Sequence, residues 1–180
     1  GIRDIGVTGV QTCALPISSM KITLNQNALS AAERDAKVAE GGFGKYYTDH
    51  MVTIDWDEQS GWGEPELKAY GPLTLDPATA VFHYGQEIFE GMKAYRQPDG
   101  SVALFRPEAN AQRFNRSAKR LALPELPIET FIETVEALVK QDIGWVPNKV
   151  GESLYIRPFM IATEVGLGVR PTNKAKYILI

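Results

Sequence analysis

The sequence of 180 residues contains one cysteine, two histidines and a net charge of only −3. A single cysteine, Cys13, excludes an internal disulfide framework and supports no metal site. His50 and His83 lie far apart in the sequence, so a zinc site built from both with carboxylates is a minor alternative, and we expect no metal. A slightly negative net charge gives no sign of the basic surface that binds nucleic acid. No apolar run approaches the ~20 residues of a membrane span.

The first nineteen residues do not match the rest of the chain. Residues 1–19 show no amphipathic period, and they lack the basic start and continuous apolar stretch of a secretory signal. The stretch GVTGVQTCALPIS resembles translated sequencing-adapter sequence joined to an open reading frame. We therefore expect residues 1–19 to be a non-native leader and Met20 to be the natural start, with a disordered native leader as the alternative.

The next part of the chain predicts a polar arm followed by strands and a helix. Residues 20–42 are polar, with Asn25, Gln26 and Asn27 and a Gly41-Gly42 pair, which is typical of a mobile arm. Residues 46–56 alternate between two sets of side chains, as a strand does. Residues 71–91 begin like a short strand and end like a helix, for which Gly91 would serve as the C-cap.

The remainder predicts a hairpin, two helices and two further strands. Pro-Asp-Gly within residues 97–100 joins two strand-like runs, because proline fixes φ and glycine accepts a positive φ. Apolar residues recur at helical spacing over residues 107–121 and 128–141. Residues 153–164 and 175–180 are typical of strands.

These elements predict an α+β fold over residues 20–180, with a mainly antiparallel sheet and helices packed on it. The composition agrees, since 44 % hydrophobic and 23 % charged residues are ordinary for a globular protein. The length suffices for one domain with a substantial core. The sequence stops on YILI, in the middle of an apolar strand, and we expect a truncated product.

A lysine and an arginine are candidates for chemistry. Lys93 lies in the dense stretch HYGQEIFEGMKAY, and a lysine that forms a Schiff base needs a buried or cationic setting. Strand alternation places Met92 and Ala94 on one face and Lys93 on the other, so we expect Lys93 to face solvent. Arg106 precedes a helix, where a guanidinium can hold a phosphate through two N–H bonds; an ordinary surface arginine is the alternative.

The strand SLYIRPF carries a second arginine. Tyr155 and Arg157 lie two residues apart and therefore on the same side of the strand. A phenol beside a guanidinium can hold a carboxylate; the alternative is a buried arginine paired with a structural aspartate. Leu167 and Val169 are apolar residues in a loop rich in glycine and proline, so we expect a neighbouring loop or a partner subunit to cover them.

From Phe43 onward, over about three quarters of its length, the chain resembles the branched-chain amino acid aminotransferases. These are fold type IV enzymes that depend on pyridoxal 5'-phosphate. The resemblance implies the small N-terminal domain of such an enzyme, without its large C-terminal domain. The matching strings, in family order, are FGKYYTDHMVTIDW, GWGEP, FHYGQEIFEGMKAY, LFRPEANAQRFNRSAKRLALP, WVP, SLYIRPFMIATEVGLGV and KYILI.

The resemblance implies roles for residues at the cofactor and the substrate. Arg106, in LFRP, corresponds to the arginine that holds the cofactor phosphate. Phe89, in IFEG, corresponds to an aromatic wall of the side-chain pocket, to which Phe43 is expected to add. Tyr155 and Arg157 correspond to the pair at the substrate pocket, where in some members the arginine holds the distal carboxylate of glutamate.

The resemblance also implies a homodimer in which the two subunits complete each other's sites. Tyr84, in HYG, corresponds to a tyrosine offered to the active site of the other subunit. Leu167 and Val169, in GLGV, correspond to apolar loop residues that cross to the partner's pocket. This arrangement would explain why apolar side chains occur in this loop.

In this family the Schiff-base lysine lies in the second domain, which implies a position beyond Ile180, so Lys93 is not that lysine. The whole protein is expected to be a cytoplasmic transaminase that converts L-leucine, L-isoleucine or L-valine and 2-oxoglutarate into branched 2-oxo acids and L-glutamate. This chain alone is expected to be inactive. The alternatives are a D-amino-acid transaminase, an aminodeoxychorismate lyase, or a non-catalytic binding domain.

Overall fold

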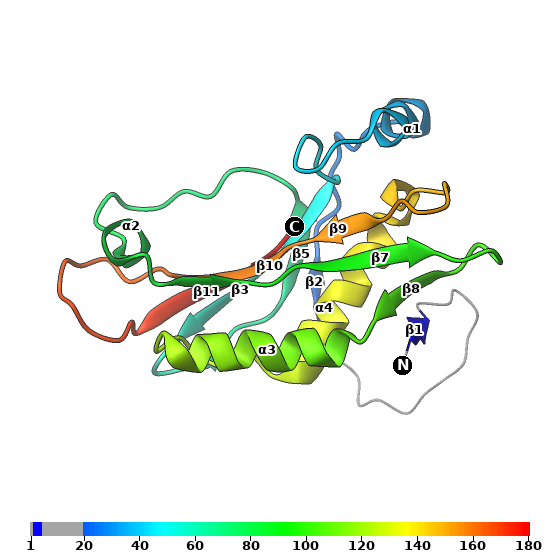
Figure 1. Ribbon diagram of the computed structural model, residues 1–180. Coiled ribbons are helices and arrows are strands. Elements are labelled where there is room, and N and C mark those ends of the chain that lie inside the picture. Colours follow the sequence, from blue (N-terminus) through cyan, green and yellow to red (C-terminus); the bar gives the residue numbers. More distant parts are fainter. Residues whose placement is uncertain (1, 5–19) are drawn as a thin grey trace.

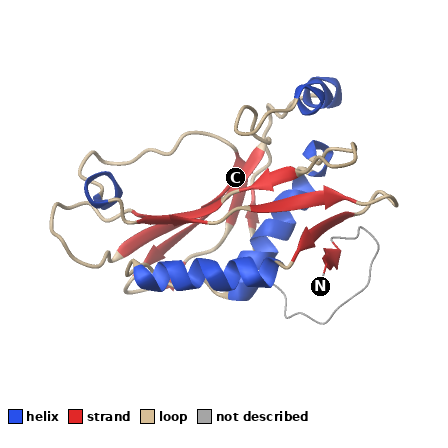
Figure 2. Ribbon diagram, in the orientation of Figure 1, coloured by secondary structure: helices blue, strands red, loops and turns tan. Residues whose placement is uncertain are grey.

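The computed structural model of the protein describes residues 2–4 and 20–180, which form two sheets with helices packed against them (Figures 1 and 2). Cys13 and most of the expected leader lie outside the described residues. The smaller sheet contains β1 (Ile2–Asp4), β7 (Met92–Arg96), β8 (Val102–Phe105) and β9 (Leu154–Ile156). The larger sheet contains β2 (Lys21–Ile22), β3 (His50–Asp57), β4 (Gly61–Trp62), β5 (Glu66–Ala69), β6 (Glu87–Phe89), β10 (Pro158–Ala162) and β11 (Lys174–Leu179).

The strand order confirms the mainly antiparallel architecture expected from the sequence. The smaller sheet has the order β1-β8-β7-β9, and the larger one has the order β2-β5-β3-β11-β10-β6, with β4 paired to β3. Among the described strands, only β2 and β5 pair in parallel. The chain passes from the smaller to the larger sheet at Arg157, the one residue between β9 and β10.

The helices predicted over 107–121 and 128–141 are confirmed. The helical segments are α1 (Ala31–Glu40), α2 (Ala80–Tyr84), α3 (Pro107–Arg120), α4 (Ile128–Gln141) and the 3-10 turn η1 (Ile143–Trp145). Pro107 begins α3, at the position where a missing N–H removes no intrahelical bond. None of the helices in residues 20–180 is long and apolar enough to cross a membrane.

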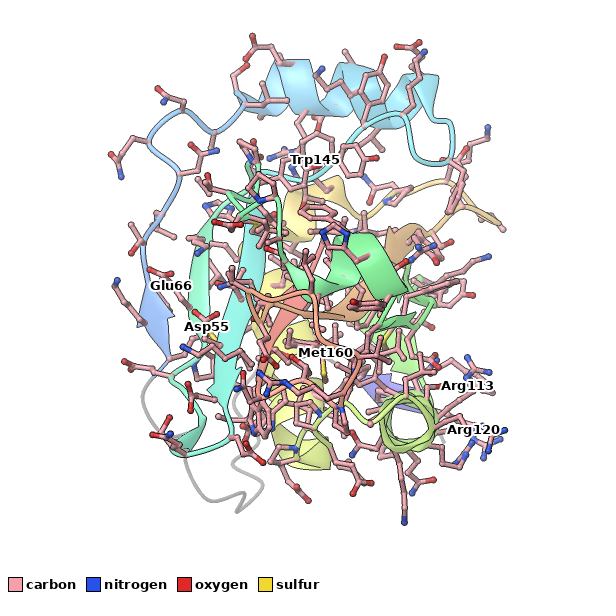
Figure 3. The ribbon with its side chains drawn as sticks, turned by 90° about the vertical axis from the view of Figure 1, so that its left-hand side faces the viewer. Asp55, Glu66, Arg113, Arg120, Trp145 and Met160 are labelled. Atoms are coloured by element: carbon pink, nitrogen blue, oxygen red, sulfur yellow. The ribbon has the colours of Figure 1, made fainter. Side chains whose placement is uncertain are left out.

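An aromatic cluster joins α3 and α4 to the larger sheet. The ring centroids of Phe114 and Phe131 are 5.5 Å apart, and Phe114 meets Tyr177 of β11 edge-on at 5.7 Å. All three side chains are almost completely buried, and the Tyr177 hydroxyl lies 3.3 Å from the Thr134 hydroxyl. Burial raises the pKa of the Tyr177 phenol. In Figure 3, Met160 of the same sheet lies in the interior, whereas Arg113 and Arg120 project outward from α3.

The hairpin predicted at residues 97–100 is also confirmed. It joins β7 to β8, with the Gln97 amide donating to the Ser101 carbonyl at 2.8 Å. The Gly100 amide donates back to the Gln97 carbonyl at 2.9 Å. Gly100 has a φ of 86°, a conformation that side chains other than glycine rarely adopt.

The expected arm over residues 20–42 has regular structure. Ser30 and Glu33 form a capping box at the start of α1, where the Ser30 amide donates to the Glu33 carboxylate at 3.0 Å. Asp49 fixes the segment before the helix, because its carboxylate accepts the Leu29 amide at 3.0 Å and the Trp145 indole N–H at 2.8 Å. The serine-to-glutamate spacing of the capping box was the available sequence signal.

The helix predicted to end at Gly91 ends earlier. α2 stops at Tyr84, and Gly85 adopts the left-handed conformation, with a φ of 57°, that ends many helices. The chain then continues as strand β6, and Gly91 lies after that strand. A glycine therefore marks the helix end as expected, but it is the glycine of the HYG string.

Replacing Phe114 by alanine tests the aromatic cluster. We expect the free energy of unfolding to fall by about 3–5 kcal/mol, since Phe114 contacts both other rings and would leave a cavity between α3, α4 and β11. Gln112→Ala, on the exposed side of α3, should change it by less than about 0.5 kcal/mol. Urea denaturation of the whole protein measures both, and equal losses would contradict the central role of Phe114.

Candidate functional site

Four of the predicted site residues form one cluster, which we call the arginine cluster: Phe43, Phe89, Tyr155 and Arg157. The Arg157 guanidinium lies over the Phe89 ring, with its central carbon 4.3 Å from the ring centroid. Phe43 packs edge-on against Tyr155, with ring centroids 4.8 Å apart. The structure therefore unites residues from separate parts of the chain. Both phenylalanine rings are largely exposed, so the cluster is open on one side.

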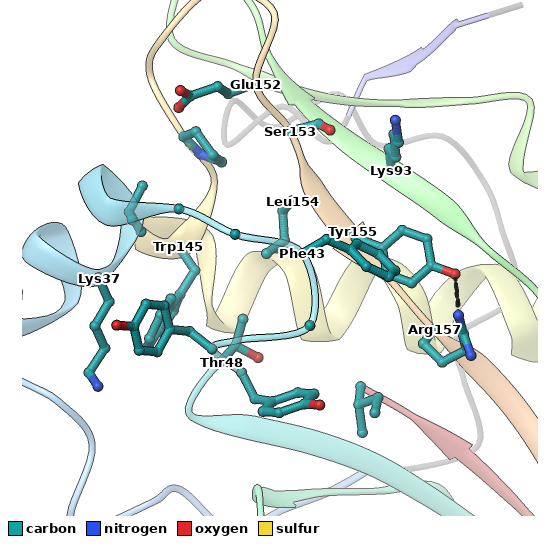
Figure 4. A pocket seen from close by; sticks show the side chains of 18 of the residues that line it. Lys37, Phe43, Thr48, Lys93, Trp145, Glu152, Ser153, Leu154, Tyr155 and Arg157 are labelled. Carbon is teal, nitrogen blue, oxygen red and sulfur yellow. Dashed lines mark hydrogen bonds between the residues drawn. The ribbon is translucent and has the colours of Figure 1, made fainter.

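Arg157 is held by a phenol. Its Nε and Nη2 atoms donate to the Tyr155 hydroxyl oxygen at 3.0 and 2.7 Å, as the dashed line in Figure 4 marks. Arg157 forms no ion pair with a carboxylate anywhere in residues 20–180. The alternative of an arginine paired with a structural aspartate is therefore wrong within these residues. Within residues 20–180, Nη1 of the guanidinium makes no hydrogen bond, and Nη2 makes only the one to Tyr155.

Three residues of the arginine cluster, Phe43, Tyr155 and Arg157, line a pocket of about 740 Å³, whereas Phe89 does not line it. Its wall also includes Lys37, Trp145 and Leu154, which come from α1, η1 and β9 (Figure 4). Neither Lys37 nor Trp145 was predicted from the sequence to line a site. Residues 20–42 were expected to be an arm, and no sequence pattern singles out Trp145. Lys93 lies at the rim with its side chain exposed, as strand alternation predicted, and points away from the tyrosine–arginine pair in Figure 4.

The other three predicted substrate residues form a second group, which we call the loop group: Tyr84, Leu167 and Val169. The Tyr84 hydroxyl donates a hydrogen bond to the Leu167 carbonyl. Leu167 and Val169 are 64 % and 86 % exposed. Figure 1 shows α2 and the loop between β10 and β11 together at one end of the molecule, away from β9. The structure therefore divides the predicted substrate residues between two places.

A buried carboxylate organises the loop that carries Leu167 and Val169. The Glu164 carboxylate accepts the backbone N–H of Asn173 at 3.0 Å and pairs with the Arg170 guanidinium. These two donors hold the pKa of Glu164 below its usual value. The Glu164 carbonyl also accepts the Ala80 amide at 2.9 Å, which ties the loop to the start of α2.

Arg106 stands at the start of α3 with its side chain exposed. Its backbone is in the left-handed region, with φ of 49° and ψ of 53°, which a residue other than glycine rarely adopts. Its guanidinium has no hydrogen bond or ion pair with residues 20–180. An arginine with a strained backbone and a free guanidinium at a helix N-terminus is a suitable anion site.

The two histidines have structural environments. His50 is buried. Its Nε2 accepts the Asn25 backbone amide at 3.0 Å, so Nδ1 donates to the Asp142 carboxylate at 2.7 Å. His83 contacts the Pro77 carbonyl through Nε2 at 2.9 Å. Within residues 20–180 there is no cluster of three histidine, cysteine or acidic side chains that could hold a metal ion.

The ion pair between Glu90 and Arg113 was also missed at the level of the sequence. Arg113 lies on α3, and its Nε and Nη2 donate to the buried Glu90 carboxylate at 2.6 and 2.7 Å. Only the fold brings these two residues together, because they are 23 positions apart and become neighbours where α3 packs against β6.

Comparisons with known proteins identify relatives of this chain, although no family model matches it. It is 60 % identical over 163 residues to the "Probable branched-chain-amino-acid aminotransferase" of Streptomyces coelicolor, covering 90 % of this chain and 45 % of that protein. It is 57 % identical over 160 residues to the branched-chain-amino-acid aminotransferase of Mycolicibacterium smegmatis, covering 88 % and 44 %. The chain thus spans less than half the length of these relatives.

A solved structure supports the same relationship. The branched-chain amino acid aminotransferase from Escherichia coli superposes with a TM-score of 0.52 at 25 % sequence identity. The match covers 72 % of this chain and 41 % of that structure. The resemblance stated from the sequence is therefore confirmed, and so is the α+β fold.

A second solved structure carries a ligand. It is a branched-chain amino acid aminotransferase from T.th. complexed with N-(5'-phosphopyridoxyl)-L-glutamate, and it superposes with a TM-score of 0.52 at 26 % sequence identity. The match covers 71 % of this chain and 39 % of that structure. That enzyme therefore binds a phosphopyridoxyl group joined to glutamate.

Acidification should release the loop between β10 and β11. Because the pKa of Glu164 is lowered in the folded protein, its stabilisation is complete above the ordinary carboxyl pKa and is lost as the pH falls through the lowered value. We expect the Asn173 amide to exchange about tenfold faster with deuterium, after correction for the intrinsic rate, once Glu164 is protonated. Glu164→Gln should exchange fast at every pH; a pH step that persists in this variant would contradict the assignment.

Proposed function

The chain belongs to the family of branched-chain-amino-acid aminotransferases, and we propose that the whole protein transfers amino groups between branched-chain L-amino acids and 2-oxoglutarate. The substrates would be L-leucine, L-isoleucine and L-valine, and the products would be their 2-oxo acids and L-glutamate. The proposal concerns the whole protein, because this chain spans about 45 % of its relatives. The expected cytoplasmic location stays a prediction.

The observation that carries the proposal is the environment of Arg157. Its charge lies against the Phe89 ring and the Tyr155 phenol, without a carboxylate from residues 20–180. Such a guanidinium can pair with the side-chain carboxylate of glutamate, which would cost several kcal/mol to bury without a partner. The surrounding rings favour an aliphatic side chain instead, through burial worth ~1.5–3 kcal/mol. One pocket could thus accept both substrate types in turn.

We infer that pyridoxal 5'-phosphate is the cofactor and that Arg106 holds its phosphate. The residues present fit such a group, since Arg106 is exposed, has no partner among the described residues, and starts a helix of 14 residues. The positive end of the helix dipole would add to the attraction. The bound cofactor would act as the electron sink for the substrate α-carbon. The lysine that attaches it is expected beyond Ile180, in the second domain.

The residues of this chain would then bind and orient the substrate. Arg157 would hold a carboxylate side chain, and Phe43 and Phe89 would exclude water around an aliphatic one. Lys93 would have no chemical role, because its side chain is exposed at the pocket rim. The second domain would cover the open side of the arginine cluster.

We also propose a homodimer in which the loop group enters the partner's pocket. The support is the exposure of Leu167 and Val169, which leaves two aliphatic side chains uncovered within the described chain. The hydrogen bond from Tyr84 to the Leu167 carbonyl would hold them in position. A two-fold dimer would let each subunit provide the same group to the other.

Assays of the whole protein test the reaction. With 2-oxoglutarate as acceptor, we expect glutamate from L-leucine, L-isoleucine and L-valine, and none from D-alanine, because the proposed pocket is that of a branched-chain enzyme. Release of glutamate and of the branched 2-oxo acid measures the reaction. Activity with D-alanine would instead indicate a D-amino-acid transaminase, and activity on aminodeoxychorismate a lyase. A protein that binds these acids without turnover would be a binding domain.

Replacing Arg106 tests the cofactor site. Arg106→Gln removes charge-assisted hydrogen bonds worth ~1.5–3 kcal/mol, so the Kd for pyridoxal 5'-phosphate should rise about tenfold to a hundredfold. Titration of the cofactor-free whole protein, followed by cofactor absorbance, measures this change. Arg116→Gln, at an exposed position of the same helix, should leave the Kd unchanged. Equal Kd values for the Arg106 variant and the native protein would contradict the assignment.

A further inference from the structure

Gly91 lies directly against the Tyr155 hydroxyl, and we propose that its missing side chain positions the Tyr155–Arg157 pair for carboxylate recognition. A Cβ atom on Gly91 would lie 2.6 Å from Tyr155 Oη and 3.2 Å from the ring atoms Cε2 and Cζ. Real Cβ atoms essentially never approach another heavy atom within 3.0 Å. Gly91 does not have a positive φ, so the lack of space, rather than the backbone conformation, requires glycine. This inference rests on the proposed function.

The backbone at Gly91 cannot easily move away from Tyr155. The Glu90 amide donates to the Pro158 carbonyl at 2.8 Å. The buried Glu90 carboxylate binds Arg113 through two hydrogen bonds and accepts the Asn110 amide nitrogen at 3.0 Å. The same Asn110 nitrogen lies 3.3 Å from the Gly91 carbonyl oxygen. The Glu90–Arg113 ion pair and the Asn110 side chain therefore fix the backbone next to Tyr155.

Tyr155 is restricted as well. It pairs with Lys93 in the β7–β9 ladder, so its backbone belongs to the same sheet as the strand that follows Gly91. Phe43 packs edge-on against its ring at a centroid distance of 4.8 Å. A methyl group at position 91 would therefore displace the end of the ring, which carries the hydroxyl.

Displacement of that hydroxyl would release Arg157. The Tyr155 oxygen is the only acceptor that the side chain of Arg157 has within residues 20–180. Without it, the guanidinium keeps its charge and its contact with Phe89 but loses the two hydrogen bonds that set its angle. Binding of a carboxylate needs that angle, because two N–H groups must face two oxygens. Binding of an aliphatic side chain does not, since burial has no direction.

The proposal therefore predicts a substrate-specific defect. In the whole protein, Gly91→Ala should raise the KM for 2-oxoglutarate about tenfold, the loss expected when a charge-assisted bidentate contact is misaligned. The KM for L-leucine should change by less than about twofold. Steady-state kinetics with both substrates measures this difference. A general structural defect would instead raise both KM values or lower the kcat of the reaction.

Two further variants complete the test. Gly71→Ala is the matched control, because Gly71 has no positive φ and no atom lies within 4 Å of the place its Cβ would take, and it should leave both KM values unchanged. Tyr155→Phe removes the nearest atom that a Cβ on Gly91 would meet, so adding Gly91→Ala to it should change the KM for 2-oxoglutarate by less than about twofold. Additive effects of the two substitutions would overturn the proposal.

The outcomes separate this inference from the proposed function. If the native whole protein transfers no amino group from L-leucine, the proposed function fails. If the native protein is active and Gly91→Ala affects both substrates equally, only the role of Gly91 fails. If Gly91→Ala does not fold, the double variant with Tyr155→Phe must fold and must match Tyr155→Phe in both KM values; otherwise the proposal is wrong.

Discussion

The site depends on a guanidinium that is fixed in place without being neutralised. A carboxylate partner would fix Arg157 equally well, but it would also neutralise the positive charge of the guanidinium. Here the Tyr155 hydroxyl takes two N–H groups and the Phe89 ring supports the flat face of the guanidinium, an interaction worth ~0.5–2 kcal/mol. Neither partner carries a negative charge, so the arginine remains able to pair with an acid. Under the proposed function, this is what lets one pocket accept glutamate as well as leucine.

The two-sheet architecture creates this arrangement. Arg157 is the residue at which the chain leaves the smaller sheet and enters the larger one, and its amide and carbonyl both bond to Ile180 at 2.7 and 3.2 Å. Tyr155 lies on one side of this junction and pairs with β7, whereas β10 pairs with β6, which carries Phe89. The junction thus brings partners from two sheets to one side chain. Gly91, between β6 and β7, lies at the same crossing.

The opposite end of the molecule follows a different principle. There the Glu164 carboxylate binds two donors of the same chain, the Arg170 guanidinium and the Asn173 backbone N–H. The loop that Glu164 holds exposes aliphatic side chains. A neutralised carboxylate gives rigidity and no recognition, while an unneutralised arginine gives recognition. The same chain uses both, at opposite ends of strand β10.

The sequence by itself determined the features that depend on neighbours along the chain. Pro-Asp-Gly specified the hairpin, apolar spacing specified α3 and α4, and strand alternation placed Lys93 outside. The capping box of α1 was equally local, although it was missed. The site residues were also found in the sequence, but through resemblance, and their roles remain predictions.

Only the tertiary structure decided which of those residues meet. Residues 43, 89, 155 and 157 converge because two sheets join at Arg157, and no local pattern encodes that junction. A sequence pattern fixes which way a side chain faces on its own element, whereas its contacts depend on how distant elements pack.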